Sequence, residues 1–233
     1  FAYEYMGKKY WIDRKKVNYI PHGIDIGKFD DNLKRKDEDL NIKLRSVLDK
    51  HFCITYTGAL SKSEGLITLV ESAKYLKKYK NIRVIIVGSG TEKEKLKEVI
   101  SKDNLYNVLM FEKQNRDLIP LILNKSDILF CGLMEREAFK YGISKNKFYD
   151  YMAAKNPIIF ASSVRGSLIE QAKAGLTITP NDPFRLSESI LYLYYNINTA
   201  GKQYAENGRA FVEKYHTTRR IANEFLQVIT SIN

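Results

Sequence analysis

Apolar residues recur along this chain with two periods, and together these predict alternating strands and helices. Short runs of Val, Ile, Leu and Phe that end at glycine, proline or a polar turn indicate buried strands. Runs in which apolar residues return every three or four positions indicate amphipathic helices. The predicted strands are 52–57, 82–87, 108–111, 128–131, 157–161 and 175–178. The predicted helices between and after them are 63–78, 91–100, 117–123, 168–174 and 182–195, with a capping box of Thr91 and Glu94 and a cap at Asp182.

Strands that alternate with helices in this way imply a parallel sheet covered by helices on both faces. Because the crossovers are right-handed, the unit is expected to be α/β, doubly wound and Rossmann-like. Two helical patterns, 204–215 and 218–229, follow with no strand between them. Ahead of the sheet we expect a short helical or linker segment, a strand over 17–25 broken by Pro21, and a charged excursion with a helix over 30–50.

One helix, within the stretch 141–159, has a start suited to binding phosphate. Ser144 is a good N-cap, an apolar face follows, and the pattern stops before Pro157. The start of a helix presents unpaired N–H groups and a positive dipole, and Lys145 and Lys147 add charge. Asn146, Lys147 and Asp150 share one face, where a carboxylate can accept ribose hydroxyls. A capped amphipathic helix with a solvated charged face explains the same residues, and both interpretations stay open.

Composition and charge narrow the classes of function. The chain has 233 residues, 44% hydrophobic, which suffices for a substantial core. Lys and Arg number 38 against 27 Asp and Glu, a net charge of +11 that suits nucleic acid, an acidic membrane or an anionic substrate. The lysines alternate with acids on helix faces, which disfavours nucleic acid as a partner. With no apolar run of about 20 residues and no signal-peptide layout, we expect a soluble cytoplasmic protein, and the missing initiator Met suggests a fragment.

Few residues have the spacing of a known catalytic or metal site. Cys53 and Cys131 lie in apolar runs and are expected to be buried thiols. The three histidines are far apart and form no metal pattern, so neither a metal nor a cofactor is expected. The Walker, nucleophile-elbow and zinc-protease motifs are absent. His22 suits either a ligand or turn packing, and Glu135 with Glu137 suits either acid–base chemistry or a solvated loop.

Ligands of open parallel sheets bind at the carboxyl ends of the strands, near the switch in strand order. Three loops qualify here, 58–65, 88–91 and 142–147. Gly88-Ser89-Gly90 resembles the start of a dinucleotide fingerprint, but the third glycine is missing, so a nicotinamide site is disfavoured. The glycine pair either lets a ligand approach closely or makes a tight strand-to-helix turn, and these two interpretations stay open.

Taken in order, the motifs of this chain resemble those of group 1 glycosyltransferases of family 4. The motifs are Tyr-Ile-Pro-His-Gly-Ile-Asp, Tyr-Thr-Gly-Ala-Leu with Glu-Gly-Leu, Ile-Ile-Val-Gly-Ser-Gly, Ser-Asp-Ile-Leu-Phe and Lys-Phe-Tyr-Asp-Tyr-Met-Ala-Ala-Lys-Asn-Pro-Ile-Ile. The resemblance implies the C-terminal, donor-binding half of a GT-B fold without its N-terminal partner. It also implies retaining transfer of a hexose or N-acetylhexosamine from a nucleotide diphosphate sugar, usually without a metal. The form Tyr-Gly-Ile-Ser-x-Asn-Lys resembles a subgroup that builds cell-envelope and capsular polysaccharides.

The family roles carry over only in part. Of the two family glutamates separated by seven residues, the second, which binds ribose, aligns with Asp150, and the first aligns with Gly142. The family's Arg and Lys that hold the diphosphate align with Ala59 and Glu64. Lys62 is therefore expected to supply the positive charge for the diphosphate that Ala59 and Glu64 lack, and Lys145 or Lys147 to contribute to the same contact. Two alternatives remain, a GT-B sugar-nucleotide epimerase and a noncatalytic sugar-nucleotide-binding module.

The resemblance and the loops together give a set of expected sites, domains and partners. No residue is assigned to catalysis. The expected nucleotide-binding residues are Gly58, Lys62, Gly88, Gly90, Lys113, Gln114, Ser144, Lys145, Asn146, Lys147 and Asp150. The expected domains are a linker over 1–16, the Rossmann-like donor domain over 17–198, and a helical tail over 199–233 that packs on the missing N-terminal domain. That missing domain is expected to bring a glycan or lipid-linked acceptor and a peripheral membrane contact, so the fragment alone is expected to be inactive.

Overall fold

The core of the chain is a parallel β-sheet. The structure is a computed structural model that describes residues 6–7, 9–13, 17–135, 139, 143 and 145–231. The strands are β1 Phe52–Ala59, β2 Ile82–Ser89, β3 Val108–Phe111, β4 Ile128–Gly132, β5 Ile158–Ala161 and β6 Gly175–Ile178. Within the described residues they form one six-stranded sheet in the order β3-β2-β1-β4-β5-β6, with every pairing parallel. This order confirms the doubly wound, Rossmann-like fold.

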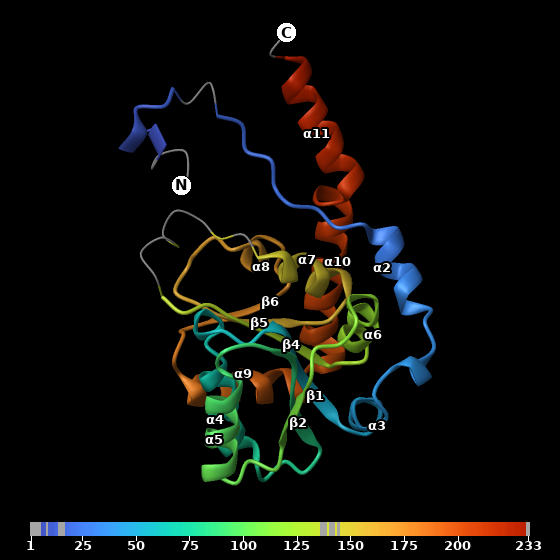
Figure 1. The fold of residues 1–233 in the computed structure, drawn as a ribbon, viewed down its shortest axis with the longest axis vertical. Helices are drawn as coiled ribbons and strands as arrows, with labels where there is room; N and C mark the ends of the chain where they lie inside the picture. Colours follow the sequence, from blue (N-terminus) through green and yellow to red (C-terminus); the bar gives the residue numbers. More distant parts are fainter. Residues whose placement is uncertain are drawn as a thin grey trace.

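Helices cover both faces of the sheet because successive strand residues point to opposite sides. In β1, Ile54 belongs to one core cluster and its neighbour Cys53 to another across the sheet. One face carries α4 Leu66–Leu76, α5 Lys93–Lys102 and α9 Pro183–Tyr195. The other carries α3 Ile42–Lys50, α6 Ile119–Asn124, α7 Asn146–Ala153, α8 Leu168–Gln171 and α10 Lys202–Tyr215. Figure 1 shows α4, α5 and α9 on one side of the sheet and α3 and α6 on the other.

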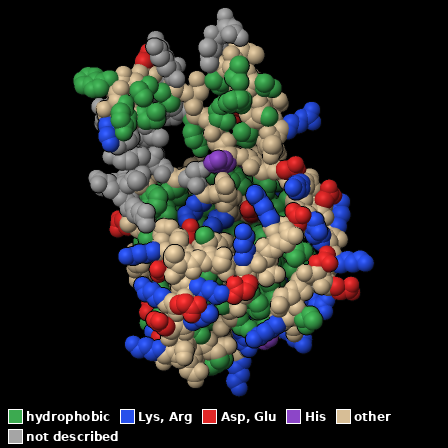
Figure 2. All heavy atoms as spheres, in the orientation of Figure 1, with side chains coloured by type: hydrophobic (Ala, Val, Ile, Leu, Met, Phe, Trp, Pro, Cys, Tyr) green, Lys and Arg blue, Asp and Glu red, His purple; other side chains and the backbone are tan. Residues whose placement is uncertain are grey.

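The tail divides into two helices with different surroundings. A short π-helix, Ile197–Gly201, leads into α10, which packs on α7, and Val212 is buried in the core. The following helix, α11 Thr218–Thr230, has no buried residue and runs away from the sheet toward the C-terminus (Figure 1). Phe225, Leu226 and Ile229 of α11 are exposed, and hydrophobic side chains gather at that end of the molecule in Figure 2. The assignment of the tail to a contact with another domain stays a prediction.

The strand expected over 17–25 was wrong. Only Ile24 pairs there, in an isolated bridge with Thr217 at the start of α11. Pro21 lacks an N–H group, and the neighbouring backbone is a helix end and not a strand, so the pairing does not extend. The chain instead enters a helix that the sequence reasoning missed, α2 Ile26–Leu33, capped by the Asp25 side chain, which accepts from the Lys28 N–H.

One predicted helix start was also wrong. The capping box of Thr91 with Glu94 does not form, because α5 begins at Lys93 and its N-cap residue, Glu92, makes no side-chain capping bond. The Glu92 N–H donates to the Leu60 carbonyl instead, which ties this turn to the loop after β1. The central helix α7 begins at Asn146 with Lys145 as N-cap. The predicted cap, Ser144, lies outside the described residues, as do Glu137 and Gly142.

Candidate nucleotide-diphosphate site

The loops that could hold a ligand meet where the strand order reverses. The order β3-β2-β1 runs one way from β1 and β4-β5-β6 runs the other, so the switch lies between β1 and β4. The loop after β1 contains a short 3-10 helix, Lys62–Glu64, whose Ser63 carbonyl accepts from the Met134 N–H after β4. The N-terminus of α7 lies at the same edge, because Lys145 donates to the Gly132 carbonyl at the end of β4.

Glu64 and two lysines form the centre of this site. Lys145 Nζ lies 2.8 Å from Glu64 Oε1, and Lys147 Nζ lies 2.7 Å from Glu64 Oε2. Lys145 also donates to the Gly132 carbonyl at 2.9 Å, and Lys147 to the Tyr56 hydroxyl at 2.9 Å. The three charged side chains are only 14%, 11% and 16% exposed. The structure therefore fixes two ammonium groups close together at the switch point.

The charge of this cluster is set by its mutual contacts. Burial raises the pKa of the Glu64 carboxyl, but the ammonium groups of Lys147 and Lys145 more than offset this, and the pKa of Glu64 lies below its usual value. Glu64 is therefore ionised at neutral pH, and one carboxylate with two ammonium groups carries a net charge of +1. Such a site favours an anionic ligand.

Two buried tyrosines form hydrogen bonds that hold the cluster of Glu64, Lys145 and Lys147 in place. The Tyr56 hydroxyl accepts from Lys147 and donates to the Ala59 carbonyl at 2.6 Å. The Tyr151 hydroxyl, from α7, accepts from the Thr57 N–H at 3.1 Å. Burial raises the pKa of both hydroxyls above the usual range, so they remain protonated. These bonds join β1 to α7 and hold the lysines of α7 over the end of β1.

Asp150 lies one turn further along α7. Its side chain is partly buried, and among the described residues its carboxylate has no hydrogen-bond partner. Burial raises the pKa of Asp150, and the charge of Arg116, in the 3-10 helix Arg116–Leu118, partly opposes that shift. A half-buried carboxylate with both oxygens available can accept two hydroxyl groups.

The glycines of the predicted site have a structural explanation. A Cβ on Gly88 would lie 1.9 Å from the Gly58 carbonyl oxygen, and one on Gly90 would lie 2.4 Å from the Leu60 carbonyl oxygen. The ends of β1 and β2 therefore approach each other too closely for any side chain, which favours the tight-turn interpretation of Gly88-Ser89-Gly90. Gly58 borders the lysine cluster, because a Cβ added to it would lie 3.2 Å from Lys147 Nζ.

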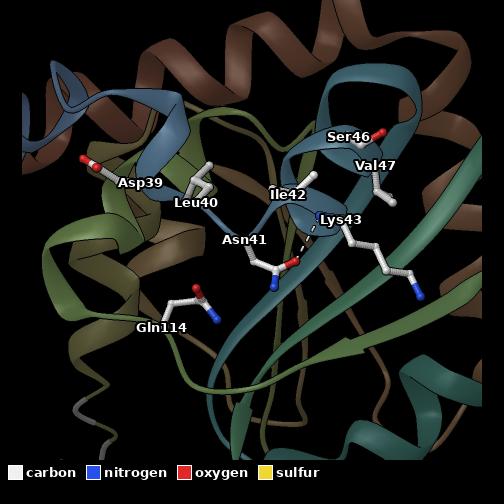
Figure 3. A pocket seen from close by; sticks show the side chains of 8 residues that line it. All are labelled: Asp39, Leu40, Asn41, Ile42, Lys43, Ser46, Val47 and Gln114. Atoms are coloured by element: carbon white, nitrogen blue, oxygen red, sulfur yellow. Dashed lines mark hydrogen bonds between the residues drawn. The ribbon is translucent and has the colours of Figure 1, made fainter.

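The remaining predicted residues lie outside the cluster. Lys62 is exposed and lines a separate hollow of about 230 Å³ beside α4 and α5. Gln114 lines a surface hollow of about 830 Å³ and faces Asn41 across it, at the start of α3 (Figure 3). Lys113 is exposed beside it, and Asn146 is exposed in the first turn of α7. The structure thus brings together Gly58, Lys145 and Lys147, whereas Lys62 lines a different hollow.

Glu64 and Tyr56 are the site residues that the sequence reasoning missed. The sequence indicates only that Glu64 replaces a positively charged residue, because it aligns with a lysine of the resembled family. The available signal was the reversal of charge at Glu64, relative to the resembled family, together with the two lysines at the start of the central helix. The sequence did not indicate Tyr56, because a tyrosine inside an apolar strand is expected to be a residue of the hydrophobic core.

The comparison with protein families settles the family. The model of glycosyl transferases group 1 matches residues 39–211, which is most of the chain. The chain belongs to this family. The match spans all six strands and the centre of the candidate site.

Curated relatives are similar over part of their length. The UDP-Gal:alpha-D-GlcNAc-diphosphoundecaprenol alpha-1,3-galactosyltransferase of Escherichia coli is 30% identical over 125 residues, 52% of this chain and 32% of the relative. The putative colanic acid biosynthesis glycosyl transferase WcaI of Escherichia coli K12 is 24% identical over 220 residues, 91% of this chain and 52% of the relative. The chain thus spans about half or less of the length of these relatives.

Solved structures agree on the fold. A glycosyltransferase from Rickettsia africae superposes with a TM-score of 0.78 at 22% identity, covering 98% of this chain and 60% of that one. Anabaena Alr3699/HepE, crystallised in complex with UDP, superposes with a TM-score of 0.78 at 18% identity, covering 94% of this chain and 58% of that one. These likenesses identify the sheet and its helices as one half of a GT-B glycosyltransferase fold.

Two further observations concern only the described part of the chain. No helix in it is both long and apolar enough to cross a bilayer. Nor do three His, Cys, Asp or Glu side chains come together there as the ligands of a metal ion would.

Proposed function

We propose that this chain is the donor-binding domain of a glycosyltransferase that uses a nucleoside diphosphate sugar. The observation that carries the proposal is the pair of ammonium groups, Lys145 and Lys147, fixed at the switch point beside the start of α7. Family membership and the UDP bound to Anabaena HepE support it.

The ligand would lie across the start of α7. The diphosphate would bind at Lys145 and Lys147, where a helix N-terminus and a net positive charge coincide. Asp150, one turn further on, would accept the ribose hydroxyls. Departure of the nucleoside diphosphate builds negative charge on its phosphate, and donors aimed at that charge lower the barrier. The lysines would therefore serve the chemical step as well as binding.

We further propose a retaining hexosyl or N-acetylhexosaminyl transfer in cell-envelope or capsular polysaccharide synthesis. The names of two relatives, one acting on a diphosphoundecaprenol-linked sugar and one assigned to colanic acid, support this context. A glycan or lipid-linked acceptor would then be bound outside this domain, and the isolated chain would bind the donor without transferring the sugar. The complete protein would work at the inner face of the membrane.

The test is calorimetric titration of the 233-residue chain with UDP, GDP, ADP and dTDP. We expect one of these to bind with a Kd in the micromolar range and to raise Tm, because a ligand of the folded state stabilises it. Lys145→Met and Lys147→Met should each weaken binding at least about tenfold, through the loss of one charge-assisted contact. Lys97→Met, on the exposed face of α5, is the matched control. Failure of all four nucleotides to bind would refute the proposal.

A further inference from the structure

Glu64 occupies the lysine donors that a diphosphate would need. An ammonium group has three N–H donors. Lys145 gives one to Glu64 and one to the Gly132 carbonyl, and Lys147 gives one to Glu64 and one to the Tyr56 hydroxyl. Each lysine therefore has one N–H donor available for a ligand while its bond to Glu64 is formed, and two when that bond is broken.

The carboxylate also opposes an anion by its charge. Glu64 lowers the charge of the cluster from +2 to +1 and lies within a hydrogen bond of both ammonium groups. A phosphate that bound the same ammonium groups would lie close to the carboxylate. At an effective dielectric constant of about 20, a unit charge about 5 Å away changes an affinity by more than about tenfold.

The backbone of Glu64 is fixed, so only its side chain is free to move. The position of a Cβ on Gly132 is 2.1 Å from the Glu64 carbonyl oxygen, which places this carbonyl directly on the end of β4. The neighbouring Ser63 carbonyl accepts from the Met134 N–H at 2.9 Å. Release of the lysines therefore requires rotation of the Glu64 side chain and not opening of the loop.

We propose that Glu64 is a built-in competitor for the diphosphate, whose carboxylate holds Lys145 and Lys147 until a diphosphate displaces it. This inference rests on the proposed function for the identity of the ligand. Two close, largely buried ammonium groups repel each other, and Glu64, paired with both, holds them in place. The same carboxylate weakens binding of the diphosphate group and so speeds release of the nucleoside diphosphate product.

The substitution Glu64→Gln separates the two effects. It removes the negative charge and keeps the size and shape of the side chain. We expect the variant to bind the preferred nucleoside diphosphate at least about tenfold more tightly. The ligand-free variant should have a lower Tm than the wild type, since two buried ammonium groups lose their counter-ion. Glu94→Gln, which removes one carboxylate from an exposed i,i+3 pair with Lys97, is the matched control and should change neither value.

Inorganic pyrophosphate is the second probe, because it tests the competition without base or ribose. If no nucleoside diphosphate binds but pyrophosphate binds more tightly to Glu64→Gln than to wild type, the inference stands and the proposed function fails. If UDP or another nucleotide binds but Glu64→Gln binds it equally or more weakly, the proposed function stands and the inference is overturned.

A crystal structure of the wild type with the bound diphosphate gives an answer that does not depend on the variant folding. Competition requires Glu64 to have left at least one of the two lysines, with its backbone unmoved. Retention of both ion pairs beside a bound diphosphate would overturn the proposal.

Discussion

Arg209 of α10 forms a two-pronged ion pair with Asp30 of α2. Its two terminal nitrogens lie 2.8 and 2.7 Å from the two carboxylate oxygens, and one of them also donates to the Ala153 carbonyl at the end of α7. Hydrogen bonding to the Arg209 guanidinium lowers the pKa of Asp30 below its usual value. One arginine thus joins the helix before the sheet to the helix after it.

Arg209→Ala should lower the free energy of unfolding by about 2 kcal/mol, because several charge-assisted bonds to a largely buried guanidinium are lost together. Arg209→Lys should recover only part of this, since an ammonium group cannot bind both carboxylate oxygens in the same geometry. Urea unfolding followed by circular dichroism measures both. Arg220→Ala, which breaks an exposed i,i+4 pair with Glu224, is the control and should stay within about 0.5 kcal/mol of wild type. Equal losses for Arg209 and Arg220 would contradict this account.

Gly88→Ala should be destabilising although alanine is the smallest possible addition. The new Cβ would lie 1.9 Å from the Gly58 carbonyl oxygen, and a backbone atom cannot move aside as a side chain can. Overpacking of this kind costs about 1–3 kcal/mol or more. Gly27→Ala in α2 is the matched control, because its Cβ meets nothing nearer than 3.5 Å and alanine favours a helix. Thermal unfolding should therefore show opposite signs for the two substitutions.

Asp127 makes stability depend on pH. Burial raises the pKa of Asp127 to about 6, although its carboxylate accepts from the Cys53 N–H. The folded state therefore binds a proton before the unfolded state does, and this residue adds stability as pH falls from about 6 to about 4. Asp127→Asn should be more stable than wild type at pH 7.5, by on the order of 2 kcal/mol, with the difference vanishing near pH 4. A difference that does not change with pH would exclude this explanation.

The sequence predicted the sheet well because each strand carries its own signal. The runs 82–87 and 108–111 are apolar and bounded by turns, and they lie within one or two residues of β2 and β3. The predictions that failed, the strand over 17–25 and the capping box of Thr91 with Glu94, concern segments whose hydrogen-bond partners are distant in sequence. The bridge of Ile24 is made with Thr217, and the Glu92 N–H is taken by Leu60, so neither feature appears in the local pattern.

The candidate site was predicted in part for the same reason. Lys145 and Lys147 were found because they begin a helix, and a helix start is visible locally. Their pairing with Glu64, more than 80 residues earlier, depends on the packing of the β1 loop on the end of β4. Charge complementarity between distant loops becomes visible only once the topology has placed both loops at the same edge of the sheet.

Asp150→Asn should change stability and nucleotide binding in opposite directions. Because burial raises the pKa of Asp150, the ionised carboxylate is disfavoured in the folded protein, and the neutral amide should raise Tm at pH 7.5. The proposed ribose contact would lose its charged acceptor, which should weaken the affinity for the nucleoside diphosphate about tenfold or more. Affinity of the wild type should also fall more steeply as pH drops than that of Asp150→Asn, because the wild type loses the Asp150 carboxylate in addition to the charge that both proteins lose on the ligand's terminal phosphate. Asp31→Asn, which removes the charge of an exposed carboxylate paired with Lys34, is the control for both measurements.

A carboxylate that lowers the stability of the folded protein but improves ligand binding has a role in function and not in stability. If Asp150→Asn raised Tm and left affinity unchanged, the carboxylate would have no part in binding ribose.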